Sequence, residues 1–196
     1  MEINGRELEY FDDTHTYLVD GIIVPSITQM LKYRFGNMYN FVDSEVLKAA
    51  AEKGTAVHEA IERWCKTGEE SELTELRNFK FLQKQYGFEV LDNEVTVILE
   101  NREGEVIAAG RLDLVISLNG KVGGADIKRT STLAKEYLAY QLNLYRIAYR
   151  QCYGVEWEFL KGIHLRDDVR KFVDIPIRED QIWNFIDEWQ RNNEFL

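Results

Sequence analysis

A β-hairpin predicted over residues 106–129 constrains the fold of this chain more than any other stretch of its sequence. Two apolar runs flank Asn119-Gly120, which is the strongest short signal for a two-residue hairpin turn. If that turn is tight, counting outward along both strands places Asp113 directly opposite Asp126. A β-bulge at Gly123-Gly124 would shift the pairing by one residue, so this alternative stays open.

The same count divides the hairpin into an apolar face and a polar face. Side chains alternate between the two faces of a strand, so the apolar face is expected to line the core. Its predicted pairs are Leu112 with Ile127 and Leu114 with Ala125. The polar face carries the two carboxylates, and one step farther out it pairs Arg111 with Lys128.

Two carboxylates that face each other destabilise a sheet unless their charge is compensated, because the side-chain carbons are only about 4.5–5.5 Å apart. A divalent cation is the simplest compensation, since Mg²⁺ and Mn²⁺ take oxygen ligands. We therefore predict a metal site at Asp113 and Asp126, with Lys128 beside it. The alternative is a salt-bridge cluster on the surface, because acidic residues on strands usually face solvent.

The composition is that of one soluble, globular domain. The chain has 196 residues, of which 45% are hydrophobic and 30% charged, enough for a sizeable core. It has no run of about 18 apolar residues that would predict a membrane span, and residues 1–10 lack the apolar centre of a signal peptide. We therefore expect a cytoplasmic location. The two cysteines, Cys65 and Cys152, argue against a disulfide framework and exclude a four-cysteine zinc or iron–sulfur site within this chain.

The net charge of -10 counts against a broad nucleic-acid-binding surface, because phosphate contacts depend on Lys and Arg. The charge is uneven along the chain, however. Residues 128–171 hold nine Lys or Arg against five Asp or Glu, a balance of +4, and the remainder carries -14. This stretch is compatible with a local track for a polyanion, although charge runs are more often solvated faces.

Periodicity and turn residues place the other elements. Residues 8–24 are predicted to form a hairpin around Asp20-Gly21, and the capping-box spacing of Ser26 and Gln29 starts a short helix to about residue 32. An aromatic loop follows over 33–41, whose rings either stack on bases or pack. The further helices are predicted at 43 or 44 to 66, 73–86, 133–153 and 179–193, and the further strands at 89–100, 157–165 and 171–177.

Three polar side chains in these elements each have two interpretations. His58 lies on the apolar stripe of the helix that ends at 66, where a histidine is either a satisfied core residue or a ligand. Gln141 interrupts the apolar stripe of helix 133–153, and a buried amide either bonds a backbone group or faces a polar site. Glu94 lies opposite or diagonal to Asp113, depending on the loop length, which would bring a third carboxylate to the site.

With these elements in place, the sequence resembles the PD-(D/E)XK nuclease superfamily, specifically its RecB-like branch, which includes phage-type exonucleases. Four motifs match in order and together span about half of the chain. They are Gly54-x-x-x-His58, Gly110-x-x-Asp113, Asp126-Ile127-Lys128 and Gln141-x-x-x-Tyr145. Residues 11–28 also resemble the opening of phage-type members.

The resemblance implies an α/β (α+β) fold with a restriction-endonuclease-like core. In this core a central mixed β-sheet is flanked by helices in the order α-β-β-β-α-β. We expect a single domain over 1–196, with an N-terminal hairpin and helix elaboration at 1–42, the nuclease core at 43–178 and a C-terminal helix at 179–196.

The resemblance also implies a metal site. His58, Asp113 and Asp126 would bind Mg²⁺ or Mn²⁺ together with the backbone carbonyl of Ile127. Lys128 would position the attacking water and stabilise charge that develops on the phosphate. Hydrolysis of a phosphodiester needs carboxylates for the metal and a cation for the phosphate, so the residue types fit the chemistry independently.

Further residues are assigned by the same resemblance. Glu94 corresponds loosely to an acidic residue that some members place near the metal. Gln141 and Tyr145, one helical turn apart on one face, would contact DNA or orient the site. Arg111 and Arg129 are additional candidates for DNA contact. The four-cysteine cluster of several members is missing, so no iron–sulfur cluster is expected.

The leading hypothesis is therefore a metal-dependent deoxyribonuclease that hydrolyses phosphodiester bonds, most simply an exonuclease of phage or prophage recombination or DNA repair. The expected partner is DNA, and a homo-oligomer or a recombination partner protein stays open. The alternative is a nuclease-fold protein that binds nucleic acid or a partner without cutting, which the acidic balance favours and the retention of Asp113, Asp126 and Lys128 disfavours.

Overall fold

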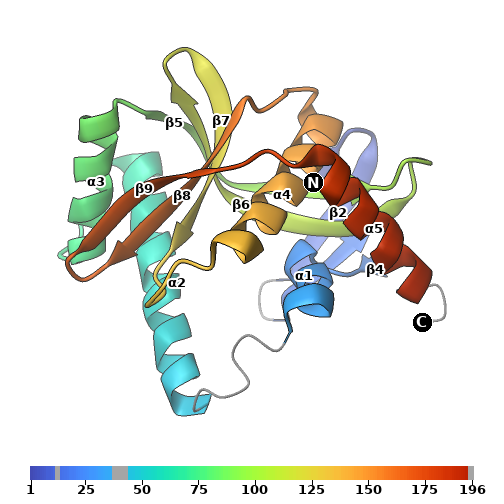
Figure 1. Ribbon diagram of the computed structural model, residues 1–196, viewed down its shortest axis with the longest axis horizontal. Coiled ribbons are helices and arrows are strands. Elements are labelled where there is room, and N and C mark those ends of the chain that lie inside the picture. Colours follow the sequence, from blue (N-terminus) through green and yellow to red (C-terminus); the bar gives the residue numbers. More distant parts are fainter. Residues whose placement is uncertain (12–13, 37–43, 194–196) are drawn as a thin grey trace.

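The computed structural model describes residues 1–11, 14–36 and 44–193. Within these residues the fold is mixed α/β, with five helices, a four-stranded antiparallel sheet and a five-stranded mixed sheet (Figure 1). The described part of the aromatic loop expected over 33–41 begins as helix rather than loop, and its residues 37–41 lie outside the described ranges.

The smaller sheet is built by the N-terminal residues. Its strands, in spatial order, are β1 (Glu2–Ile3), β2 (Arg6–Phe11), β3 (Thr16–Val19) and β4 (Ile22–Val24). The turn between β3 and β4 is at Asp20-Gly21, whose φ angles of 52° and 76° are those of a primed hairpin turn. The predicted N-terminal hairpin is confirmed, and β1 and β2 extend it into a sheet.

The larger sheet contains the hairpin that dominates the sequence. Its spatial order is β5 (Glu89–Glu100), β6 (Val106–Leu118), β7 (Lys121–Lys128), β8 (Phe159–Arg166) and β9 (Val169–Ile175). Strands β7 and β8 are parallel and the other neighbours antiparallel. A parallel pair needs a crossover connection, which α4 (Lys135–Tyr153) provides.

The register of the central hairpin is the predicted one. Asn119 and Gly120 have φ angles of 53° and 76°, and β6 pairs with β7 without a shift from Leu118↔Lys121 to Leu114↔Ala125. There is no bulge at Gly123-Gly124. These glycines instead allow close packing, because a Cβ at either position would collide with Phe159 or Trp157.

The ladder between β6 and β7 ends at Leu114↔Ala125, which corrects three predicted pairs. Asp113 and Asp126, Leu112 and Ile127, and Arg111 and Lys128 are not backbone partners in the hairpin. Beyond this point β7 continues alongside β8, while β6 continues alongside β5. The two strands therefore separate at the carboxylates.

Four more helices complete the described chain: α1 (Ile27–Phe35), α2 (Ser44–Thr67), α3 (Thr74–Tyr86) and α5 (Glu179–Asn193). Ser26 and Gln29 form the predicted capping box of α1. Gly87 and Gly154 end α3 and α4 in the left-handed conformation, with φ near 70°, as is common after a helix. None of the described helices combines the length and apolar character needed to cross a bilayer.

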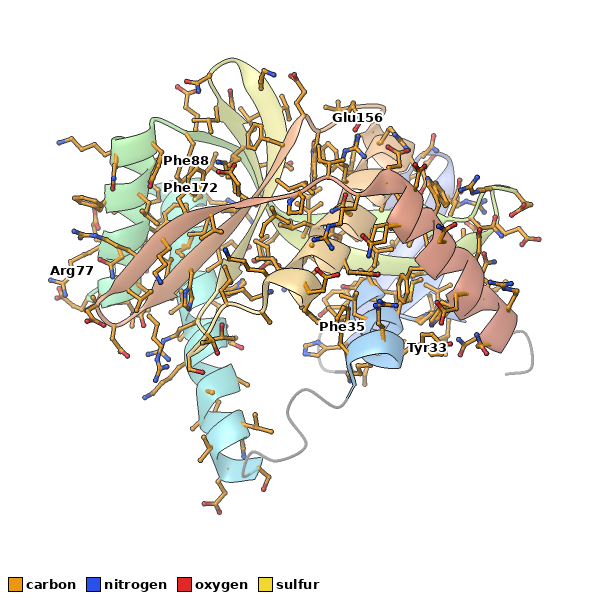
Figure 2. All side chains as sticks on the ribbon, viewed as in Figure 1. Tyr33, Phe35, Arg77, Phe88, Glu156 and Phe172 are labelled. Carbon is orange, nitrogen blue, oxygen red and sulfur yellow. The ribbon has the colours of Figure 1, made fainter. Side chains whose placement is uncertain are left out.

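The helices cover both faces of the larger sheet. Helices α2 and α3 pack on one face, where Leu114, Ala125 and Ile127 join one core cluster. Helix α4, with α1 and α5 behind it, packs on the other. Phe88 and Phe172 stack beside α3 with ring centroids 5.0 Å apart (Figure 2).

One predicted core residue packs on the other side of the sheet. Leu112 is buried as expected, but it belongs to the cluster of α4 rather than to that of Leu114 and Ile127. The simple alternation of faces along β6 is therefore lost where β6 leaves β7.

Candidate metal centre

Three acidic residues occupy one row across β5, β6 and β7. The pairs Asn93↔Leu114 and Val95↔Leu112 place Glu94 across from Asp113, and Asp126 directly follows the last residue of β7 that pairs with β6, Ala125. Of the two positions that the sequence left open for Glu94, the opposite one is confirmed.

The separation of β6 and β7 gives the site its backbone groups. The N–H of Ile127 donates to the side-chain Oδ2 of Asp113 at 2.6 Å instead of to a backbone carbonyl of β6. The carbonyl of the same residue accepts a hydrogen bond from Nε2 of His58 at 3.1 Å. The N–H and the carbonyl of Ile127 therefore bond side chains of the site instead of the backbone of β6.

The backbone of Glu94 is in the left-handed region, with φ of 52°. For a residue with a Cβ this conformation costs roughly 1–2 kcal/mol. Oε2 of Glu94 lies 2.7 Å from Nε of Arg111, on the neighbouring strand. Strained residues cluster at functional sites when their surroundings fix them, and Arg111 fixes this one.

His58, Glu94 and Asp113 form a group that could hold a metal ion. Their ligand atoms all lie within 4.8 Å of one another. Nδ1 of His58 is 3.5 Å from Oδ1 of Asp113 and 3.9 Å from Oε1 of Glu94. Carboxylate oxygens, an imidazole and the nearby carbonyl of Ile127 are donors that suit Mn²⁺ well and Mg²⁺ through the oxygens, so the residues fit the metal that the sequence predicts.

The charges of the group favour a cation. Asp113 raises the pKa of His58 to about 9 against the opposing effect of burial, and Glu94 adds to the rise. With no ion bound, the imidazolium therefore compensates the carboxylates at neutral pH. A metal ion in the same place would take over that compensation.

Asp126, which is buried, and Lys128, which is half-buried, form an adjoining pair. Oδ2 of Asp126 lies 2.6 Å from Nζ of Lys128 but has no aligned hydrogen bond. Burial raises the pKa of Asp126, and Lys128 opposes that rise. Burial lowers the pKa of Lys128, but Asp126 and Asp113 outweigh it and raise the pKa above its usual value. The ammonium therefore stays charged beside the acidic row.

These groups line one cleft of about 780 Å³, together with Gly110, Gln141 and Tyr145. The Tyr145 hydroxyl donates to the carbonyl of Arg111 at 3.0 Å. Gly110 leaves room for the Tyr145 ring, because a Cβ at position 110 would lie 2.9 Å from Cε1 of Tyr145. Gln141 is buried and its Oε1 has no hydrogen-bond partner, so of its two predicted interpretations it faces the polar site.

The two arginines proposed for DNA contact are engaged within the protein. Arg111 holds Glu94, as described above. Nε of Arg129 lies 2.6 Å from Oε1 of Glu75 on α3, and its Nη2 lies 3.3 Å from Asp167. Arg129 does not line the 780 Å³ cleft. The structure therefore brings Arg111 to the site and Arg129 to its outer side.

Residues of the N-terminal sheet were missed by the sequence analysis. Tyr10, His15 and Tyr17 line the cleft, and the Tyr10 hydroxyl is hydrogen-bonded to Nδ1 of His15 at 2.9 Å. The sheet reaches the site because the N–H of Ala109 donates to the carbonyl of Pro25 at 3.0 Å. A hairpin pattern in the sequence shows the strands but not the surface on which they pack.

Comparisons with known proteins do not name a family. No family model matches the chain, and no curated protein matches it. The chain is similar to the solved structure of SSO0001, with 18% sequence identity and a TM-score of 0.48, over 87% of this chain and 76% of that one. Such a likeness is too low to assign a fold family or an activity.

Proposed function

We propose that this protein is a divalent-metal-dependent deoxyribonuclease of the PD-(D/E)XK superfamily, with a restriction-endonuclease-like core. The observation that carries the proposal is the group formed by His58, Glu94 and Asp113, whose ligand atoms lie within 4.8 Å of one another. The pair of Asp126 and Lys128 lines the same cleft. Four motifs far apart in the sequence thus contribute to one site.

The ligands of the proposed ion are His58, Asp113, Glu94 and the carbonyl of Ile127. Asp126 is also a predicted ligand, and in the structure one of its oxygens faces Lys128. A bound Mg²⁺ or Mn²⁺ would lower the pKa of water and neutralise charge on a phosphodiester.

The side chains around these ligands have separate tasks. Lys128 stays protonated, so it supplies positive charge for the phosphate rather than acting as a base. Arg111 holds Glu94, and the Tyr145 hydroxyl holds the Arg111 backbone. The Oε1 atom of Gln141 is buried and has no hydrogen-bond partner, so it can accept from a water or a substrate group only if the cleft rearranges.

An exonuclease of recombination or repair is the form to test first, because the motif resemblance is strongest to that branch. A nuclease-fold protein that binds without cutting is the second candidate. The observation that favours it is the pairing of Arg111 and Arg129 with protein carboxylates in a chain of net charge -10, which leaves these two guanidinium groups neutralised.

The decisive experiment is a timed digestion of end-labelled and circular DNA, single- and double-stranded, with Mn²⁺ or Mg²⁺. We expect Asp126→Asn and Lys128→Ala to lower the rate more than about 100-fold with unchanged circular dichroism. Asp174→Asn and Lys121→Ala are matched controls, because these side chains are 87% and 60% exposed. If both site variants cut as well as the controls, the protein is not this nuclease.

A further inference from the structure

A second hollow adjoins the cleft on the other side of the metal group. It has a volume of about 440 Å³ and lies between the first half of α2 and the end of β7 with the residues that follow it. Figure 1 shows this half of α2 extending beyond the rest of the molecule. We call this hollow the α2–β7 groove, and define it by Val46 and Leu47 on α2 and by Arg129, Thr130, Ser131 and Arg166 opposite them.

The groove and the cleft meet at the proposed reaction centre. Both hollows are lined by Ala51, Gly54, His58 and Lys128. The space beside Gly54 at this junction is open, because a Cβ at this position would meet nothing within 4 Å. A polymer whose phosphodiester lies at the metal group must extend in two directions. The cleft offers space for one direction and the groove for the other.

The lining of the groove differs in charge from that of the cleft. The cleft is lined by five carboxylates, whereas the groove has Lys128, Arg129 and Arg166 and no carboxylate among its lining residues. Each of these cations also pairs with a carboxylate outside the groove lining, Lys128 with Asp126, Arg129 with Glu75 and Arg166 with Asp167. Ser131 adds a hydroxyl group that can donate to phosphate, whereas the Thr130 hydroxyl donates to the carbonyl of Thr132 at 2.8 Å. In a chain of net charge -10, this surface is suited to an anionic strand.

The opposite wall of the groove is apolar and accessible. Val46 and Leu47 are 59% and 36% exposed, and Ala50 lies beside them on the same helix. Nucleic-acid strands offer both an anionic backbone and the apolar faces of unstacked bases. A groove with cations and hydroxyls on one side and aliphatic side chains on the other matches both parts of such a strand.

We propose that the α2–β7 groove binds the nucleotides on one side of the scissile phosphodiester, and that the strand passes from the cleft into the groove over Gly54. This inference rests on the proposed nuclease function and adds a binding site to it. The site is predicted to contribute to long substrates and not to small phosphodiesters, which reach only the metal group.

Two variants test the groove. Gly54→Leu places a side chain in the junction, and the open space there and the better helix propensity of leucine predict an unchanged or higher melting temperature. Ala56→Leu is its control, on an exposed position of α2 that lines neither hollow. Ser131→Asp adds a negative charge to the groove, and Asn119→Asp adds the same charge at the exposed hairpin turn.

The measurements are binding of a fluorescent single-stranded 12-mer in Ca²⁺, and Mn²⁺-dependent hydrolysis of both this oligonucleotide and thymidine 5′-(p-nitrophenyl phosphate). We expect Gly54→Leu and Ser131→Asp to weaken oligonucleotide binding about tenfold and to slow its cleavage. In Ser131→Asp, whose side chain lines the groove and not the cleft, hydrolysis of the small substrate should stay within about twofold of wild type. In Ser131→Asp the plot of the logarithm of the binding constant against the logarithm of the salt concentration should become shallower by about 0.7. This is the value for one phosphate contact of a single strand.

The groove proposal and the nuclease proposal are contradicted by different results. If both variants bind and cleave the oligonucleotide like their controls, the groove is not a substrate site, while the nuclease proposal stands. If Ser131→Asp loses the small substrate as well, this substitution acts on the metal group, and the groove proposal is again wrong. If the wild type hydrolyses neither substrate, the proposed function fails first, and the binding assay in Ca²⁺ then decides whether the groove holds a strand.

Discussion

Binding of Mn²⁺ to the candidate centre should release a proton from His58. Asp113 and Glu94 raise the pKa of this imidazole to about 9 in the metal-free protein, and a metal ligand must be the neutral form. At pH 7.5 only about 3% of the imidazole is neutral. Asp126, with a pKa of about 6, is already largely ionised at this pH. Binding therefore displaces close to one proton, and His58 is its source.

The sign and size of the pH dependence follow from the same value. Because the raised pKa means that the free site holds the proton, affinity should increase with pH, by about tenfold per unit between pH 7 and 8.5. It should level off above pH 9. At pH 7.5 the proton weakens binding about 30-fold, or about 2 kcal/mol, relative to that plateau.

Isothermal titration calorimetry with Mn²⁺ in buffers of different ionisation enthalpy measures the number of protons directly. His58→Asn removes the titrating group, so the variant should release almost no proton at pH 7.5 and show weaker, nearly pH-independent binding. A wild-type protein that binds Mn²⁺ without releasing a proton, or with the same affinity at pH 6.5 and 8.5, would refute His58 as a ligand held in this electrostatic environment.

Three further variants test the fold and the site. Glu179→Gln should lower the free energy of unfolding by about 1–2 kcal/mol at pH 7, discounted for a side chain that is 35% exposed. The two arginines of α4 lower the pKa of Glu179 to about 2, so its contribution is complete above pH 4.5 and is lost as the pH falls toward 2. Urea unfolding at pH 7 and pH 3 measures the difference. Gly124→Ala should destabilise by about 1–3 kcal/mol or more, because the new Cβ meets the ring of Trp157, and thermal melting measures the loss. Arg111→Ala should weaken Mn²⁺ binding about 10- to 100-fold by releasing Glu94, with Arg111→Lys between the two in calorimetry.

Each of these predictions has an opposing result. An equal loss for Glu179→Gln at pH 3 and pH 7 would show that its ion pairs do not stabilise the fold. A Gly124→Ala protein as stable as wild type would mean that the strand and Trp157 move apart easily. Unchanged Mn²⁺ affinity in Arg111→Ala would place Glu94 outside the metal group.

Local chemistry explains why much of the fold could be predicted. The turn residues Asn119 and Gly120 determine the register of the hairpin, and the register determines that Asp113 and Asp126 come to the same end of it. Capping and termination signals likewise predicted α5 to the residue and the other helices to within a few residues. These features depend on neighbours in sequence.

The remaining features depend on contacts between distant segments. Glu94 has a positive φ, and its side chain pairs with an arginine on the next strand; nothing in the strand pattern around residue 94 predicts the positive φ. Arg129 looked available to DNA, but its partner Glu75 is 54 residues away on α3. The separation of β6 from β7 also involves a distant segment, since β7 stays paired with β8 as far as Lys128 after its pairing with β6 ends at Ala125.

The left-handed backbone at residue 94 favours glycine, whereas the proposed metal centre needs a carboxylate at the same position. Glycine at this position would relieve the conformational strain but would also remove the ion pair with Arg111 and a ligand of the proposed ion. The residue at position 94 in related chains therefore tests the proposed metal centre, because glycine is compatible with the backbone there and not with a third acidic ligand.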